Sequence, residues 1–208
     1  CPKNAWEWGF SPIQKHGACF MRSILLAVIV SLSALGVPAN AKTVADWRWL
    51  SGTTWYVPTS GLPAYVYTPL NNTLTAVTDQ TVYTITGYRN GYFWGRTAGQ
   101  LGTSDVSCMS LVGSVTPEGK IYLTFTPFPF GPGDEPTIGV GTMVRKAGQW
   151  MMQNQMSTGS PSLQIGHWAY MVQTKPNTAS WYSLPGVGVS VPDFMEAYLD
   201  AAPTAPPP

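Results

Sequence analysis

Few side chains in this chain have the types and the spacing that catalysis or metal binding requires. After residue 41 the sequence contains one histidine, His167, which stands on an alternating segment with no partner identifiable nearby. This context favours a half-buried structural residue over a general base. One histidine and one cysteine, Cys108, are too few ligands for a zinc site. Asp134 and Glu135 are expected in a loop, where their carboxylates are solvated. We therefore expect a protein that is not an enzyme and that carries no cofactor or metal.

Aromatic and amide side chains are plentiful instead, and such side chains line pockets for partly apolar ligands. The segment "QWMMQNQMS" (149–157) places two methionines and Asn154 on the same face as Trp150. An amide inside a barrel is costly without partners and implies water, a polar network or a bound ligand. The alternative is that the amides face solvent and the Trp–Met face is core. The predicted ligand-binding residues are Tyr83, Trp94, Arg145, Trp150, Asn154 and Trp168.

The N-terminal part of the chain has the features of a secretory signal. Arg22 follows Met21, an apolar run covers residues 24–35, and "ANA" at 39–41 is a small-x-small cleavage site. The run is shorter than the roughly 20 apolar residues that span a bilayer. We expect cleavage after Ala41, a periplasmic or secreted product and no stable membrane span afterwards, with a retained anchor as the alternative. Residues 1–20 are interpreted as an upstream leader outside the fold.

Charge and cysteine content narrow the classes of partner. The 11 basic and 10 acidic residues give a net charge of +1, and they form neither a basic stripe nor an acidic block. This distribution argues against nucleic acid as a partner. Of three cysteines only Cys108 follows the predicted cleavage site, so the fold must be stable without an internal disulfide. Cys108 itself lies in an apolar segment and is expected to be buried.

Between residues 48 and 174 the sequence has the two-residue period of β-strands. In "KIYLTFT", for example, Ile121, Leu123 and Phe125 fall on one face. Turn signals such as Asn90-Gly91 recur at nearly regular intervals. The predicted strands lie near 48–57, 62–68, 80–88, 91–98, 107–115, 120–127, 137–146, 149–157 and 165–174. Two longer connections, 127–136 and 157–164, are expected at the mouth of a cavity.

This pattern predicts an all-β fold, an antiparallel up-and-down β-barrel of eight or nine strands with a short C-terminal helix at 191–200. Residues 42–200 form a single domain, and 201–208 form a disordered Pro-rich tail. A sandwich is the alternative, although it would need more long crossing connections. An outer-membrane barrel is disfavoured because Gln, Asn, Arg and Lys occur on mixed faces of the strands.

The stretch "LSGTTWYVP" (50–58) after a signal peptide, followed by hairpins and a late helix, resembles the opening of calycins, the lipocalin and avidin-like barrels. Those families begin their first strand with Gly-x-Trp, and here one extra residue separates Gly52 from Trp55. The resemblance implies a Trp55 that closes the barrel floor and an arginine over it, for which Arg145 is the candidate.

These features predict an exported, non-catalytic β-barrel that binds a small, partly apolar ligand in its interior. The alternative is a periplasmic or secreted protein-interaction module, such as a hydrolase inhibitor, whose loops contact a protein partner. Ligand binding is expected to shift tryptophan fluorescence.

Overall fold

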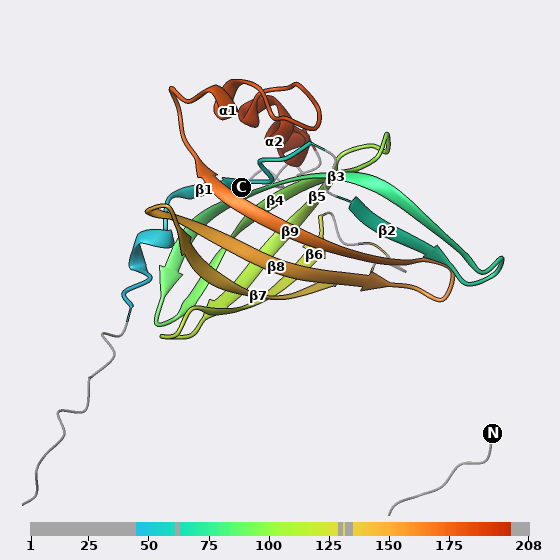
Figure 1. Cartoon of the computed structure of the whole chain (residues 1–208), viewed down its shortest axis with the longest axis horizontal. Coiled ribbons are helices and arrows are strands. Elements are labelled where there is room, and N and C mark those ends of the chain that lie inside the picture. Colours follow the sequence, from blue (N-terminus) through green and yellow to red (C-terminus); the bar gives the residue numbers. More distant parts are fainter. Residues whose placement is uncertain (1–44, 61–62, 129–130, 132–134, 201–208) are drawn as a thin grey trace, which may run out of the picture. The chain divides into compact units, whose positions relative to one another are not determined.

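The computed structural model of the chain describes residues 45–60, 63–128, 131 and 135–200, the last four by their backbone alone. The predicted leader, signal segment and Pro-rich tail lie outside these residues. Strands make up most of the described part (Figure 1). The elements are η1 (Arg48–Leu50), β1 (Thr53–Tyr56), β2 (Pro63–Thr68), β3 (Thr73–Arg89), β4 (Tyr92–Leu101), β5 (Ser107–Val115), β6 (Lys120–Pro127), β7 (Thr137–Lys146), β8 (Gln149–Gly159), β9 (Gln164–Thr174), α1 (Ala179–Tyr182) and α2 (Val191–Asp200).

The strands close into an antiparallel barrel. From β3 to β9 each strand pairs with the next along the chain, and both β1 and β2 pair with β3 on one side and β9 on the other. Because β1 and β2 pair with the same two neighbours at successive heights, together they fill one position in the wall. The barrel therefore has eight strand positions, and the predicted up-and-down barrel with a short C-terminal helix is confirmed.

The first wall position is interrupted between Tyr56 and Pro63. Tyr56 pairs with Val82 and Pro63 with Thr78, so more residues separate the two on this strand than on β3. The side chain of Gln80 partly replaces the missing ladder bonds. Its Nε2 donates to the Val57 carbonyl at 3.3 Å, and its Oε1 accepts from the Gly186 amide at 3.0 Å. Gln80 thus ties the broken strand to the segment between α1 and α2.

One end of the barrel is closed by tryptophans around η1. Trp55 points inward and is fully buried, and its ring lies 6.1 Å from that of Trp49. Trp47 is 5.1 Å from Trp150 and donates to a backbone carbonyl at 2.9 Å. Gly52 precedes β1 and has a φ of +79°, so it is not part of the alternating strand. The extra residue between Gly52 and Trp55 therefore does not turn the Trp55 side chain outward.

The C-terminal helix packs on the outside of the wall. Phe194 and Val191 of α2 cover Val82 of β3 and Ala98 of β4, so both wall residues are buried although they face outward. No helix among the described residues has the length and apolar character needed to cross a membrane.

The predicted element boundaries differ most from the structure at two places. Residues 48–50 form a 3-10 helix where a strand was expected, and β3 begins at Thr73, earlier than the predicted residue 80. The Asn90-Gly91 turn is confirmed, with φ values of 51° and 86° that suit a tight hairpin.

Candidate functional site

The end of the barrel away from η1 contains a cavity of about 320 Å³. The difference between the two halves lies in the sizes of the inward-facing residues. Toward η1 these are large, including Ile121 and Met152. Toward the other end they are small, including Thr81, Thr97 and Gly99, so the wall encloses space that side chains do not fill. The barrel is therefore packed at one end and hollow at the other.

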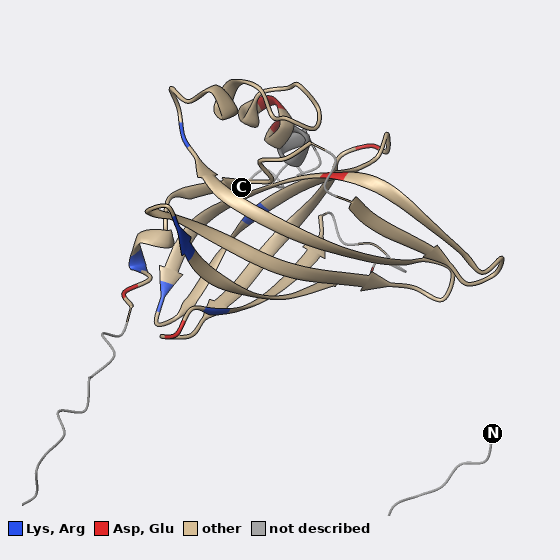
Figure 2. Ribbon diagram, in the orientation of Figure 1, with Lys and Arg blue, Asp and Glu red and all other residues tan. Residues whose placement is uncertain are grey.

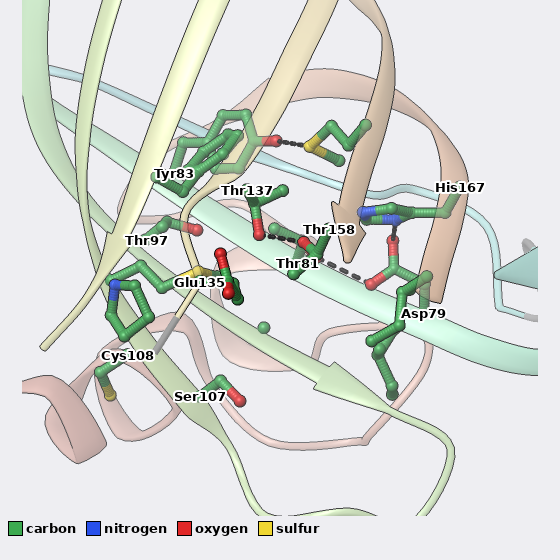
Figure 3. A pocket seen from close by; sticks show the side chains of 17 residues that line it. Asp79, Thr81, Tyr83, Thr97, Ser107, Cys108, Glu135, Thr137, Thr158 and His167 are labelled. Carbon is green, nitrogen blue, oxygen red and sulfur yellow. Dashed lines mark hydrogen bonds and ion pairs between the residues drawn. The ribbon is translucent and has the colours of Figure 1, made fainter. Parts of the chain in front are cut away.

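The lining of the cavity comes from β3 to β9 and from the connection before β7 (Figure 3). Pro127 and Glu135 flank the predicted mouth connection at 127–136, and Thr158 and Ile165 flank the one at 157–164. Residues of both predicted connections thus line the cavity, but in the second only Thr158 does so, and it belongs to the end of β8. The apolar lining residues are Tyr83, Leu101, Met109, Phe125, Pro127, Met156 and Ile165.

A buried histidine–aspartate pair forms the main polar feature of the wall. His167 on β9 and Asp79 on β3 face inward from either side of β2, and the Nδ1 of His167 lies 3.0 Å from Oδ2 of Asp79. The other carboxylate oxygen accepts a hydrogen bond from Thr81 at 2.8 Å. The side chains of His167 and Asp79 are 10% and 1% exposed, so the pair is held out of bulk water. Both groups line the cavity.

Tyr83 forms the apolar floor of the cavity together with Phe125, their rings 5.2 Å apart. Its hydroxyl donates to the sulfur of Met156 at 3.0 Å, a weak acceptor. Burial raises the pKa of Tyr83 well above its ordinary value, and the charge of Asp79 adds to the effect. Asn154 beside the phenol acts in the opposite direction and lowers the pKa, although its amide makes no hydrogen bond of normal geometry to the described residues. The phenol is therefore neutral over the physiological range.

Two sets of hydroxyls complete the polar lining. Thr137 and Thr158 hydrogen-bond to each other across β7 and β8. Thr97 is fully buried, and its Oγ1 has no partner among the described residues. A buried hydroxyl without a partner costs free energy, which a bound molecule or water could recover.

The electrostatic character of the lining is neutral to acidic. Asp79 and Glu135 are the acidic residues among the described lining residues, and His167 is the titratable nitrogen base. None of these lining residues is Lys or Arg, and Figure 2 shows the positions of Lys and Arg mainly near turns and strand ends. In addition, no group of metal-ligating side chains is found in the part of the chain that the structure describes.

A second hollow of about 520 Å³ lies at the closed end, between the β7–β8 turn and the chain that follows β9. Trp150 and Lys175 contribute to its lining, and most of its residues are exposed. Its lining residues come from the start of β1, the β7–β8 turn and the end of β9, and none of these described residues is acidic or histidine.

The six predicted ligand-binding residues are dispersed by the structure. Tyr83 lines the cavity. Asn154 faces the interior but lies beneath the cavity in the packed half, fully buried. Trp94 and Trp168 were expected to line the interior, and the structure places them on the outer surface at 45% and 50% exposure. Their strands turn the opposite set of alternate residues inward, which sequence alternation alone cannot decide.

The other two predicted residues lie at the closed end. Trp150 packs against Trp47 and Trp49. Arg145 is exposed, and its guanidinium carbon lies 5.9 Å from the centre of the Trp150 ring. An arginine thus covers a tryptophan at the barrel floor, as the calycin resemblance implied, but that tryptophan is Trp150, whereas Trp55 packs against Trp49 with the two rings tilted.

Sequence reasoning missed the Asp79–His167 pair. His167 was interpreted as structural because no partner stood near it, and the partner is 88 residues away in sequence. The sequence contained only an indirect signal: Asp79 precedes the predicted strand 80–88, and His167 lies within the predicted strand 165–174. Only the barrel's closure brings them together.

The closed eight-position antiparallel barrel with its short helices is consistent with a calycin-like fold. The chain matches no protein family model, no curated protein and no solved structure with which it was compared.

Proposed function

We propose that this chain is a non-catalytic binding protein that holds a small, partly apolar ligand in the hollow half of its barrel. The observation that carries the proposal is the unfilled interior itself. Its volume of about 320 Å³ equals that of roughly ten water molecules. Binding sites for small molecules are commonly cavities of about 300–1,000 Å³ with mostly apolar walls and a few convergent polar groups.

The lining has this composition. Phe125, Met156 and Ile165 supply apolar surface, and displacement of water from such surface favours association. The Asp79–His167 pair supplies an oriented polar group at one side. An oriented imidazole costs little further ordering on binding, because its ring is already held by the carboxylate.

Thermal unfolding with and without a panel of small amphipathic compounds tests this proposal. A ligand at 100 times its dissociation constant stabilises the folded state by about 2.7 kcal/mol. For a chain of this size each kcal/mol raises the melting temperature by about 2–4 °C. Tryptophan fluorescence is a poorer readout than the sequence suggested, because no tryptophan is among the described residues that line the cavity.

Two glycines offer a matched pair of variants. Gly99 lines the cavity, and a Cβ there would make only an ordinary contact with Thr81 at 3.4 Å. Gly99→Leu should therefore fill the hollow and abolish ligand stabilisation. Gly166 on β9 is exposed, and a Cβ there meets nothing within 4 Å. Gly166→Leu should leave ligand stabilisation unchanged. Equal responses of the two variants, or no stabilisation of the parent by any compound, would rule out binding in this cavity.

A protein-interaction function has separate support on the outer surface. Trp168 and Tyr170 of β9 face outward with their rings stacked at 16° and 6.4 Å, and both are exposed. Tyr122 and Val140, which pair across β6 and β7, are also exposed. Exposed apolar groups that gather on one face are typical of interaction surfaces. If the barrel acts in this way, Trp168→Ser should weaken partner binding while ligand stabilisation of the cavity stays unchanged.

Export to the periplasm or outside the cell is part of the proposal, and it rests on the features of residues 21–41. N-terminal sequencing of the exported product tests it. The expected first residue is Lys42, and a product that retains Met21 would contradict cleavage.

A further inference from the structure

The histidine in the cavity wall has a fixed proton arrangement. Both oxygens of the Asp79 carboxylate act as acceptors, one toward Thr81 and the other toward Nδ1 of His167. A carboxylate has no hydrogen to donate, so Nδ1 must carry the proton that joins the pair. In the neutral ring the other nitrogen, Nε2, then has a free lone pair. In its uncharged form, His167 is thus oriented by Asp79 as a hydrogen-bond acceptor toward whatever lies in front of Nε2.

The lone pair faces the cavity. His167 is among the lining residues, and Figure 3 shows its second nitrogen turned away from Asp79 toward the interior. No hydrogen bond of this nitrogen is found among the described residues. Nε2 is therefore positioned to accept a hydrogen bond from a molecule bound in the cavity.

The other charged groups at the cavity select against anions. Asp79 and Glu135 are acidic, and no basic residue occurs among the described lining residues that could neutralise a bound carboxylate or phosphate. An anion placed beside Nε2 would meet a lone pair and a nearby negative charge. Moving such an ion out of water without a compensating partner is strongly unfavourable.

We propose that the cavity takes a molecule with an apolar body, at least one O–H or N–H donor and no negative charge, either an alcohol or an amine in its ammonium form, whose donor bonds to Nε2 of His167. This assignment rests on the proposed ligand-binding function and adds the class of ligand. The apolar body lies against Phe125 and Met156, and the donor points toward β9.

Four probes with one aromatic body separate the contributions: 2-phenylethanol, its methyl ether, 2-phenylethylamine and phenylacetate. The alcohol and the amine should bind the full chain, with the ether about tenfold or more weaker because Nε2 is left buried and unpaired. Phenylacetate should give no measurable binding. Dissociation constants come from calorimetry and from the ligand dependence of the melting temperature.

The outcomes distinguish this inference from the function on which it rests. If the ether or phenylacetate binds as tightly as the alcohol, the cavity binds ligands but the assigned class is wrong. If none of the four probes binds while other compounds of the panel stabilise the parent, the ligand class is wrong and the proposed function stands. If no compound of the panel stabilises the parent either, both fail. Gly99→Leu serves as the control for binding elsewhere, because it should remove binding of every probe.

Nitrogen-15 NMR of the imidazole tests the same inference without altering the site. The chain has two histidines, and His16→Gln leaves the signals of His167 alone. In the uncharged ring, recorded at a pH where one nitrogen is unprotonated, Nδ1 should carry the proton and Nε2 should not, and addition of 2-phenylethanol should shift the Nε2 resonance most. A protonated Nε2 in the neutral ring, or a bound alcohol that leaves Nε2 unmoved, would overturn the proposal.

Discussion

Replacement of Asn154 by leucine should stabilise the protein. Asn154 lies on β8 with its side chain toward the interior and is fully buried, and neither polar atom of its amide has a hydrogen-bond partner among the described residues. Met152 and Met156 lie before and after it on the same face, and both are buried. A polar group in such surroundings has lost its bonds to water and gained nothing in exchange.

The size of the effect follows from two opposing contributions. A buried polar atom without a partner costs about 1–3 kcal/mol, so the two atoms of the amide together cost about 2–6 kcal/mol. Leucine has the same number of side-chain heavy atoms but is bulkier at its branch, and overpacking costs about 1–3 kcal/mol. Asn154 pairs with Gly141 on β7, where a Cβ would collide with Asn154 Oδ1. Because Gly141 has no side chain, the neighbouring strand cannot make more room for a bulkier residue at position 154. We expect a net gain of about 1–3 kcal/mol for Asn154→Leu.

Urea denaturation followed by circular dichroism measures the gain as a higher midpoint with an unchanged slope. Gln155→Leu is the matched control, because the neighbouring side chain faces outward and is exposed. A surface change of this kind should alter stability by less than about 0.5 kcal/mol. Asn154→Asp should be destabilising by several kcal/mol, since it places an unpaired charge in the same site.

An unchanged or lower stability of Asn154→Leu would refute the reasoning. It would mean that the amide is bonded in solution, for instance by a buried water, because removal of a satisfied group exposes the unsatisfied partner. In that case the double variant Asn154→Leu with Tyr83→Phe would recover stability, since the phenol is the polar group beside the amide.

Two further predictions concern β3. Burial raises the pKa of Tyr83 well above its ordinary value of 10.0, so the phenol is protonated below pH 10 in both the folded and the unfolded state. Above pH 10 only the unfolded chain ionises at this position, and the free energy of unfolding should fall by up to about 1.4 kcal/mol per pH unit. In denaturant titrations at pH 8 to 11, Tyr83→Phe should lack this part of the alkaline loss of stability. Gln80→Ala removes the hydrogen bonds to Val57 and Gly186, so it should lower the free energy of unfolding by about 1–3 kcal/mol and speed amide exchange at Gly186. The control Gln100→Ala loses one exposed hydrogen bond and should change stability little. Equal losses of stability in the two variants would contradict the role of Gln80.

Much of the fold could be predicted from the sequence because strand alternation and turn chemistry are local. "KIYLTFT" indicated that Ile121, Leu123 and Phe125 share a face, and all three are in the core. Asn90-Gly91 indicated a hairpin at its correct place. The split of the first wall position was not predictable in this way. It depends on how β3 and β9 pair with the two pieces, and the Gln80 bonds that hold it join residues far apart in sequence.

The site was less predictable, because alternation identifies two faces without saying which one is inside. Trp94 and Trp168 were assigned to the interior for their size, and they face solvent. The inside of the hollow half is lined by Thr81, Thr97 and Gly99, whose small size gives no signal when a sequence is searched for ligand contacts. A cavity forms where inward-facing residues are too small to fill the space between strands. Strand register decides which small residues face one another, and sequence alternation does not give that register.

The two halves of the barrel also separate stability from binding. Asn154 is fully buried beside the Tyr83 phenol and does not line the cavity, whereas His167 and Asp79 do. Since Asn154 is not part of the lining, the Asn154→Leu change should raise the melting temperature of the free protein while leaving ligand-induced stabilisation intact. Gly99→Leu should do the reverse, removing the ligand response with little change in the free protein. Loss of ligand response in Asn154→Leu would show that the two halves are coupled through Tyr83 and that the bound molecule reaches the amide.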